Sequence, residues 1–318
     1  MRIAVLGCGR WGSFLAWYLC RTGHEVTLYG RAASWRMERL LKYRENDLLQ
    51  IPEAVQLTTD LAAAVSRAEV LVISVGVQSL RSFLRELAGL DLSGRALVLC
   101  MKGLEAETGL RITEIVGQEL GPIPCAIWVG PGHVQDFLRG VPNCMVIDSA
   151  DAVLREALVR AFSSDLIRFY YGDDLIGNEI GAAAKNVVGI AAGMLDGYGL
   201  TSLKGALMAR GTREVGRLIG ALGGSERSAY GLAHLGDYEA TVFSPYSHNR
   251  AFGERFVRGE RYAQLAEGMA TAKALRVLST RCGVGLPICG AVYDVLYEGV
   301  NPREALSNLF LRSLKREF

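Results

Sequence analysis

Three glycines near the start of the chain have the spacing of a turn that binds a pyrophosphate. Gly7, Gly9 and Gly12 follow the apolar residues 3–6 and precede a segment with helical periodicity. Between a strand and a helix, the first glycine allows a tight turn, the second lets the backbone approach the pyrophosphate, and the third lets the helix pack closely. The amides at the start of that helix attract anions. The motif therefore predicts dinucleotide binding, and a glycine turn with a purely structural role is the alternative.

The type of dinucleotide depends on the residue that ends the second predicted strand. A site specific for NAD carries Asp or Glu there, which holds the ribose hydroxyls. This chain has Gly30 followed by Arg31. Because no carboxylate is present to repel a 2′-phosphate and arginine pairs well with one, the sequence favours NADP (NADPH) and leaves NAD as a second option. The alternative is that Arg31 is an ordinary surface charge.

Two lysines could supply a proton or a positive charge to a reaction. Lys185 lies in a predicted helix that is rich in glycine and alanine, residues 181–193. In apolar surroundings the pKa of a lysine falls, so Lys185 could exchange a proton near neutral pH, as the reduction of a carbonyl group requires. Lys102 follows a predicted strand, at the sheet edge where doubly wound folds bind ligands. Position alone also allows an ordinary helix lysine at 185 and a solvated lysine at 102.

The elements that must position these residues alternate between strand and helix in the first half of the chain. Strands are predicted at residues 2–6, 25–29, 69–75, 96–101, 125–129, 143–147 and 166–171, with helices at 11–21, 77–90 and 113–120. Strands that are apolar throughout are buried on both faces. This order predicts an α/β fold in residues 1–172, built on a Rossmann-type, doubly wound, mostly parallel sheet.

Helical periodicity takes over beyond that point, so residues 173–318 are predicted to form an all-helical domain. Residues 230–259 interrupt it with glycine, serine and asparagine, and we expect a long loop there, of the kind that is often functional. Asn301 and Pro302 are expected to begin the last helix, as its cap and its first residue.

The composition excludes several classes of protein. With 35 Lys and Arg against 33 Asp and Glu, the net charge of +2 is too small for a protein that coats nucleic acid or an anionic membrane. No segment reaches the roughly 18 apolar residues of a membrane helix. Glycines interrupt the apolar start of the chain and no cleavage site follows, so we expect a cytoplasmic protein. Seven scattered cysteines and four histidines suit neither a disulfide framework nor a metal site, and the thiols are expected to be inert.

Ordered motifs along the whole chain resemble those of the bacterial NAD(P)H-dependent glycerol-3-phosphate dehydrogenases. The similarity extends from the first predicted strand to about Leu311. The matching segments are residues 7–12, 101–105, 130–131, 184–187, 196–197, 209–211, 231–237, 247–253 and 286–288. The resemblance implies an N-terminal Rossmann domain, a C-terminal helical domain for substrate binding and catalysis, and an active site between them.

The resemblance also implies a reaction, the reversible reduction of dihydroxyacetone phosphate to sn-glycerol 3-phosphate, which supplies phospholipid synthesis. Lys185 would be the general acid that protonates the developing alkoxide, and Lys102 would contact both substrate and cofactor. The family's substrate positions correspond to Lys102, Gly130, Gly132, Lys185, Asp237, Ser247, His248 and Asn249. Its cofactor positions correspond to Gly7, Gly9, Arg10, Trp11, Gly12, Arg31, Lys102, Val134, His248 and Glu267. Arg10 and Val134 differ in type from the usual serine and alanine.

Two departures from the family pattern fall on its substrate side. The family's Gly-Pro-Ser/Thr ends here in Gly132, which lacks the hydroxyl, and its Ser-Arg-Asn has His248 in place of arginine. Arginine grips a phosphate with two permanent hydrogen bonds, whereas histidine is mostly neutral at pH 7. Each loss costs about 1 to 3 kcal/mol if nothing replaces it. Arg250 belongs to the family pattern, so it becomes a substitute only if the segment rearranges.

Two other functions are therefore weighed against this one. One is an NADP-dependent reductase of a different small ketone, phosphorylated or phosphonate. The other is a dinucleotide-binding sensor without catalysis, which would need only the Rossmann half of the chain. The lysines at 102 and 185 argue against the sensor. A homodimer is the oligomer that the family resemblance implies.

Overall fold

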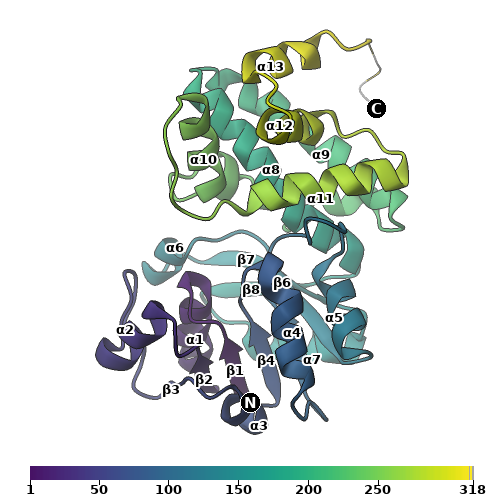
Figure 1. Ribbon diagram of the computed structural model, residues 1–318. Coiled ribbons are helices and arrows are strands. Elements are labelled where there is room, and N and C mark those ends of the chain that lie inside the picture. The colour runs from purple at the N-terminus through teal and green to yellow at the C-terminus, as the bar shows by residue number, and fades with distance from the viewer. Residues whose placement is uncertain (315, 317–318) are drawn as a thin grey trace. The chain divides into compact units, whose positions relative to one another are not determined.

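The computed structural model describes residues 1–314 and 316, and contacts divide it into two units. The first consists of Met1–Lys102 with Arg111–Leu175, and the second of Gly103–Leu110 with the chain from Ile176 onward. The sequence-based division at residue 172 did not anticipate that Gly103–Leu110 packs with the second unit. Strands β1 to β8 all belong to the first unit, and the regular elements of the second are helices (Figure 1).

An eight-stranded sheet forms the centre of the first unit. Its strands lie in the order β3-β2-β1-β4-β5-β6-β7-β8, and every neighbouring pair is parallel except β6 and β7. This arrangement confirms the predicted mostly parallel, doubly wound sheet. The strands are β1 (Arg2–Leu6), β2 (Glu25–Tyr29), β3 (Gln56–Thr58), β4 (Val70–Ile73), β5 (Ala96–Leu99), β6 (Cys125–Val129), β7 (Asn143–Ser149) and β8 (Ile167–Tyr171).

The register of the central strands brings their carboxyl ends to one edge. Leu6 of β1 lies opposite Tyr29 of β2 and Ile73 of β4. The residues that follow each strand, Gly7 and Gly30 among them, therefore lie together at that edge. In a doubly wound sheet this is the edge where ligands bind.

Helices cover both faces of this sheet. The helices of the first unit are α1 (Arg10–Arg21), α2 (Trp35–Tyr43), α3 (Leu61–Arg67), α4 (Leu80–Ala88), α5 (Ile112–Leu120), α6 (Val134–Leu138) and α7 (Ala152–Phe162). Alternate strand residues such as Val72 and Val98 join α1 and α7 in one core, while the intervening Leu71 and Leu97 are equally buried on the other face. The sequence predicted α1, α4 and α5 but not α2, α3, α6 and α7.

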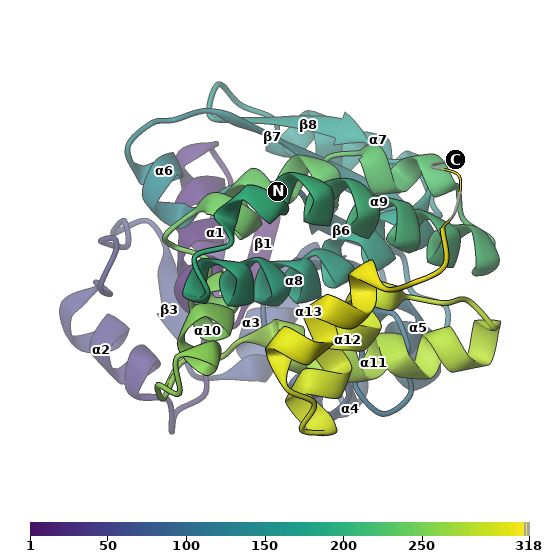
Figure 2. The same ribbon diagram turned by 90° about the horizontal axis from the view of Figure 1, so that it is seen from above.

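The second unit is helical, as predicted. Helix α8 (Leu175–Gly197) runs through its middle, and it shares one core with α9 (Lys204–Ala221), α11 (Glu267–Cys282) and α12 (Pro287–Tyr297) (Figure 2). Helices α10 (His248–Val257) and α13 (Pro302–Phe310) complete it. The Asn301 side chain accepts a hydrogen bond from the amide of Arg303, which confirms the predicted cap of the last helix.

The long loop expected over residues 230–259 is wrong. Short helical turns at Leu235–Asp237 and Glu239–Phe243 fill its first half, and α10 fills the second. Its polar composition masks an apolar pattern, because Tyr238 and Val242, four residues apart, are both fully buried. The segment is therefore a packed part of the helical unit.

The inserted segment Gly103–Leu110 is tied to α11 by polar and apolar contacts. Lys273 forms an ion pair with Glu107 at 2.6 Å, and Leu104 is fully buried in the core of the second unit. Gly109 has a φ of +69°, and a Cβ there would lie 3.0 Å from the side chain of Leu278. The chain thus leaves the first unit directly after Lys102 and returns to it at Arg111.

None of the helices within residues 1–314 is long and apolar enough to span a membrane. All seven cysteines lie in this range, and none forms a disulfide. Burial raises the pKa of the Cys100 and Cys289 thiols, so both remain protonated at neutral pH. In the same range there is no group of three or more His, Cys, Asp or Glu side chains that could hold a metal ion.

Candidate active site

The glycine turn after β1 has the geometry of a phosphate-binding turn. Gly7 has a φ of +121°, and a Cβ there would lie 2.2 Å from the carbonyl oxygen of Ser74. A Cβ at Gly12 would lie 1.8 Å from the carbonyl oxygen of Gly7. Gly9, the N-cap of α1, differs from both, because its missing Cβ faces open space. Packing thus requires the first and third glycines, while the second leaves room for a phosphate at the start of α1.

Aromatic and apolar side chains surround this turn. Trp11 contacts Phe14 and Phe137, with ring centroids 5.0 and 6.4 Å apart. Val134, the first residue of α6, is buried, whereas Arg10 at the start of α1 is exposed. These positions fit a dinucleotide, whose apolar rings need apolar walls.

The end of β2 has no space for an acidic side chain. A Cβ at Gly30 would lie 2.5 Å from the sulfur of Cys8 and 2.9 Å from that of Met37. The next residue, Arg31, is exposed. The structure thus adds a steric reason for the absence of a carboxylate at this position.

Lys102 and Gly130, two predicted substrate residues, are in direct contact. The Lys102 ammonium donates a hydrogen bond to the carbonyl oxygen of Gly130. Gly130 has a φ of +124°, and a Cβ there would lie 3.0 Å from the Cα of Met145. The contact holds the amine beside the turn that follows β6.

Gly132, in the same turn, has no space for a side chain. Its φ is +143°, and a Cβ there would lie 2.4 Å from the ring of Phe137. Phe137 is fully buried in the core of the first unit. An aromatic ring therefore takes the space that the first atoms of a serine or threonine side chain would need.

In the second unit, Lys185 and Asp237 form a buried ion pair. The Lys185 ammonium lies 2.7 Å from Asp237 Oδ2, and the two side chains are 9% and 1% exposed. Lys185 also donates a hydrogen bond to the Thr241 hydroxyl at 2.9 Å, and that hydroxyl donates to the carbonyl oxygen of Asp237 at 2.7 Å. A carboxylate and a hydroxyl thus orient one ammonium group, which is the arrangement that a directed proton donor requires.

Asn249 connects this lysine to two further helices. Its amide nitrogen donates to Asn186 Oδ1 at 3.0 Å, and its amide oxygen accepts from the Gly268 amide at 2.9 Å. Asn186 follows Lys185 in α8, and Gly268 follows the predicted cofactor residue Glu267 at the start of α11. The structure therefore brings Lys185, Asp237 and Asn249 together with the start of α11.

The glycines of α8 allow this close packing. A Cβ at Gly189 would lie 2.8 Å from the Thr241 side chain, and one at Gly193 would lie 1.9 Å from the Arg250 carbonyl oxygen. A Cβ at Gly181 would meet His234 at 2.9 Å. At Gly193 another backbone approaches, as predicted, whereas at Gly189 and Gly181 the close neighbour is a side chain.

Ser247 and His248, two predicted substrate residues, form hydrogen bonds within the second unit. The Ser247 side chain caps α10 by accepting a hydrogen bond from the Arg250 amide at 3.3 Å. His248 forms a hydrogen bond with the Tyr262 hydroxyl at 2.6 Å, and the Arg255 guanidinium lies over the Tyr262 ring.

Arg250 does not replace the missing arginine. Its guanidinium is bound to Asp196 at 2.8 Å, to Glu254 at 3.1 Å and to the Ser244 carbonyl oxygen at 3.1 Å. All three contacts lie within the second unit, so protein groups already bind the guanidinium.

Sequence reasoning missed three residues of this site. Thr241 carries a clear signal, since it lies four residues after Asp237 and shares its helical face. Asn186 stands beside Lys185 in the chain. Tyr262 lies 14 residues from His248, and only the folded chain shows that the two side chains meet.

Comparisons with known proteins cover both parts of the chain. Residues 2–154 match the family model described as the NAD-dependent glycerol-3-phosphate dehydrogenase N-terminus, and residues 174–307 match that of its C-terminus. The NAD(P)+ glycerol-3-phosphate dehydrogenase of Pelodictyon phaeoclathratiforme is 36% identical over 100% of this chain and 99% of its own. That of Bradyrhizobium sp. (strain ORS 278) is 39% identical over 99% and 98%.

Solved structures show the same relationship. A glycerol-3-phosphate dehydrogenase from Coxiella burnetii superposes with a TM-score of 0.90 at 28% identity, covering 98% of this chain and 99% of that one. A D-mandelate dehydrogenase, at 14% identity and a TM-score of 0.61, shares the fold alone. Both halves of the chain and its full length thus lead to one assignment, and the chain belongs to the NAD-dependent glycerol-3-phosphate dehydrogenase family.

Proposed function

We propose that this protein reduces dihydroxyacetone phosphate reversibly to sn-glycerol 3-phosphate, with NADPH as the preferred cofactor and NADH as the second. The observation that carries the proposal is the buried ammonium of Lys185, held by Asp237 at 2.7 Å and Thr241 at 2.9 Å. Such a group suits a reaction in which a ketone oxygen gains a negative charge and then a proton.

The residues of the chain divide the chemistry between them. The hydride for the keto carbon would come from a nicotinamide bound at the site. Lys185 donates its proton to the ketone oxygen as that oxygen becomes an alkoxide, and in the reverse direction it accepts the hydroxyl proton. Asp237 and Thr241 orient the ammonium during this transfer. Lys102 adds a second positive charge on the substrate side and is itself positioned by the Gly130 carbonyl.

The cofactor side rests on the glycine turn and its surroundings. Gly7, Gly9 and Gly12 would hold the pyrophosphate at the start of α1, where the open space beside Gly9 fits it. Arg31 would pair with the 2′-phosphate, and no carboxylate competes with that contact because Gly30 is closely packed. The remaining residues proposed for the cofactor are Arg10, Trp11, Lys102, Val134, His248 and Glu267.

The phosphate side of the substrate is the least conventional part of the proposal. Of the two family groups that this chain lacks, neither is replaced by Arg250, whose guanidinium is engaged elsewhere. His248, oriented by Tyr262, and Ser247 with Asn249 remain the proposed substrate residues of α10. The alternative is a reductase of the same type for another small ketone, favoured by the loss of a phosphate-binding arginine.

A sensor that binds the dinucleotide without catalysis is less well supported. It would need neither the buried pair of Lys185 and Asp237 nor the hydrogen bond between Asn249 and Asn186. We further propose that the enzyme acts in the cytoplasm, that its product supplies phospholipid synthesis, and that it forms a homodimer.

The test is the consumption of NADPH by the purified protein across a panel of ketones. The panel contains dihydroxyacetone phosphate, its phosphonate analogue, other phosphorylated ketols and unphosphorylated dihydroxyacetone. We expect the highest kcat/KM with dihydroxyacetone phosphate. A higher value with another ketone would favour the alternative reductase, and NADPH binding without turnover on any ketone would favour the sensor.

A further inference from the structure

A second buried lysine–aspartate pair lies in the helical unit, away from Lys185. Lys204, the first residue of α9, has its ammonium 2.6 Å from Asp196 Oδ2, near the end of α8. The two side chains are 5% and 12% exposed. A lysine is buried to this degree only when its charge is compensated, and neither residue belongs to the reaction described above.

Both buried lysines bind the same helical turn. Lys185 donates to the side chain of Thr241, and Lys204 donates to the carbonyl oxygen of the next residue, Val242, at 2.9 Å. The turn, Glu239–Phe243, is π-helical, a rare and wide form. Lys185 therefore holds the turn through the side chain of Thr241, and Lys204 holds it through the backbone carbonyl of Val242.

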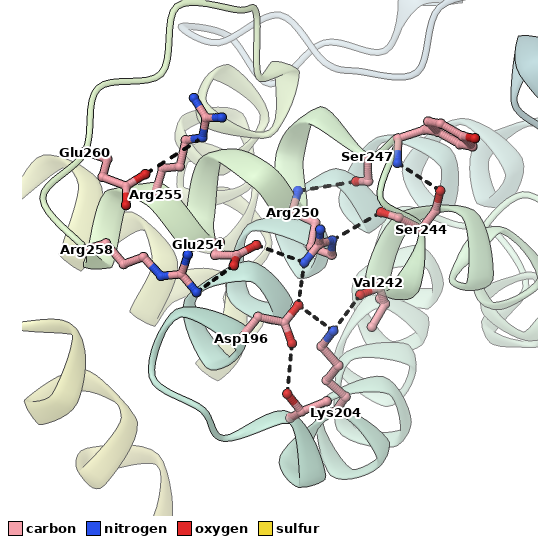
Figure 3. Close-up of polar contacts among 12 residues, drawn as sticks. Asp196, Lys204, Val242, Ser244, Ser247, Arg250, Glu254, Arg255, Arg258 and Glu260 are labelled. Carbon is pink, nitrogen blue, oxygen red and sulfur yellow. Dashed lines mark hydrogen bonds and ion pairs between the residues drawn. The ribbon is translucent and has the colours of Figure 1, made fainter.

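Arg250 extends the second pair to the start of α10. Its guanidinium binds Asp196 Oδ2 at 2.8 Å, and its Nε donates to the Ser244 carbonyl oxygen at 3.1 Å (Figure 3). Val242 and Ser244 thus offer their carbonyls, at the end of the turn, to two cations that share Asp196. Cations are favoured at the carbonyl end of a helical segment.

Asp196 compensates both cations as a carboxylate. Burial acts to raise the pKa of Asp196, but hydrogen bonds from Lys204, Arg250 and Thr201 hold it below its ordinary value. Without that charge, the buried Lys204 ammonium would lose its carboxylate, whereas Arg250 would keep Glu254 at 3.1 Å.

We propose that Asp196, Lys204 and Arg250 are positioning residues for the reduction, which fix the turn and the start of α10 so that Thr241 stays against Lys185 and Asn249 against Asn186. The proposal rests on the proposed function. It assigns the network no contact with substrate or cofactor. We expect the network to position only residues 239–249, because its side chains bind the carbonyls of Val242 and Ser244 and the first turn of α10.

The test compares Lys204→Met and Asp196→Asn with a matched control, Lys273→Met. Lys273 also forms an ion pair in the helical unit, with Glu107 at 2.6 Å, but it is 38% exposed and lies outside the network. Each variant is assayed for kcat and KM with dihydroxyacetone phosphate, for NADPH binding by fluorescence, and for thermal unfolding. Amide hydrogen exchange over residues 239–249 is measured on the same samples without substrate.

In Lys204→Met we expect kcat to fall by about 100-fold, since a displacement of about 1 Å has that effect on an oriented reaction. NADPH binding should stay within about twofold of the wild type, as should all parameters of Lys273→Met. Hydrogen exchange should accelerate over residues 239–249 in Lys204→Met and Asp196→Asn. Lys204→Arg, which keeps the charge, should recover part of kcat.

The proposal is overturned if folded Lys204→Met keeps wild-type kcat and wild-type exchange in this segment. It is also overturned if kcat falls only in proportion to the unfolded fraction. If Lys204→Met does not fold, Arg250→Lys replaces it, because that variant keeps the charge beside Asp196 and loses the Nε donor to Ser244. If the wild-type protein does not turn over dihydroxyacetone phosphate, the proposed function fails, and the exchange data still decide whether the network fixes the turn.

Discussion

Lys185 is held by two side chains that lie one helical turn apart. Asp237 supplies the charge and Thr241 the hydroxyl, and both are joined by the hydrogen bond from that hydroxyl to the Asp237 carbonyl. Lys102 is held in a different way, by the backbone carbonyl of Gly130. The two lysines are therefore positioned in different ways, one by a carboxylate and a hydroxyl and the other by a backbone carbonyl.

Arg31 is the residue from which the cofactor preference is predicted. Arg31→Asp should shift the ratio of kcat/KM for NADPH and NADH toward NADH, because a carboxylate repels the 2′-phosphate and binds ribose hydroxyls. Because Arg31 is exposed, its replacement should leave the fold intact. The ratio is obtained from initial rates with each cofactor, and an unchanged ratio would remove Arg31 from the site.

His248 is the residue at which the substrate side can be restored. His248→Arg should lower KM for dihydroxyacetone phosphate by about tenfold, because a bidentate grip on phosphate contributes about 1.4 kcal/mol or more. KM for unphosphorylated dihydroxyacetone should not change. Equal effects on both ketones, or none on either, would contradict a role of position 248 beside the phosphate.

At the scale of elements, close packing explains why the site uses so many glycines. Helix α8 meets the segment that carries Thr241 and Arg250 at Gly189 and Gly193, where any Cβ would collide. The turn after β6 meets α6 in the same way at Gly132. Substitutions at these glycines therefore act through packing before they act through chemistry.

Gly132→Ser tests this reading directly. It should not lower KM for dihydroxyacetone phosphate, although it restores the family's hydroxyl, and it should destabilise the protein by about 1 to 3 kcal/mol through collision with Phe137. The control is Gly140→Ser, since Gly140 also has a positive φ, of +79°, but open space around its missing Cβ. Urea denaturation of both variants separates collision from backbone strain, and equal losses of stability would refute the collision.

Some strands and site residues could be predicted from the sequence, and other parts of the fold could not. Strands β1, β2 and β6 have the predicted bounds, because their runs of apolar residues belong to a sheet that is buried on both faces. Lys185 and the glycine turn could be found because each stands out from its neighbours in the sequence. Lys185 is a charged residue in a run of glycine and alanine, and the three glycines lie between an apolar strand and a helix. The segment 230–259 could not, because its glycines and serines hide the burial of Tyr238 and Val242.

Pairings between distant segments were also beyond the sequence. The contact of His248 with Tyr262 and that of Arg250 with Asp196 depend on how α10 packs. The sequence left open whether Arg250 could reach the substrate, and the structure gives it other partners. Phe137 likewise became relevant to Gly132 only through the turn that brings them together.

At the scale of the whole molecule, a small net charge does not prevent a few charged side chains from being buried. The net charge is +2, yet the helical unit buries two lysines, each with its own carboxylate. The helical unit also buries a histidine, His234, whose protonation affects the stability of the fold.

Burial lowers the pKa of His234 from 6.5 to about 4, and the side chain is held by the Gly181 carbonyl and the Tyr238 hydroxyl. A neutral histidine in the folded state must compete with a protonated one in the unfolded state below pH 6.5. Above pH 6.5, His234 therefore does not change the free energy of unfolding with pH. Below it, the free energy of unfolding falls as the pH drops toward 4. We expect a loss of about 2 kcal/mol from this group between pH 7.5 and pH 5.

The measurement is urea denaturation at pH 7.5, 6 and 5. His234→Gln should flatten the pH dependence by that amount, whatever its own stability at pH 7.5. His24→Gln is the control, because His24 is more exposed and its pKa is lowered less. A wild-type slope in His234→Gln would show that other groups cause the pH dependence.

The central claim is that Lys185 gives a proton to a ketone that NADPH reduces, and one comparison tests it most directly. Purified wild-type protein and Lys185→Met are given NADPH and dihydroxyacetone phosphate, and the loss of NADPH and the gain of glycerol 3-phosphate are followed together. The control is Lys273→Met, a lysine of the same unit that is 38% exposed and paired with Glu107. We predict equal loss and gain in the wild type and the control, and in Lys185→Met a rate at least about 100-fold lower with NADPH binding retained. A Lys185→Met protein that turned over at the wild-type rate would contradict the account.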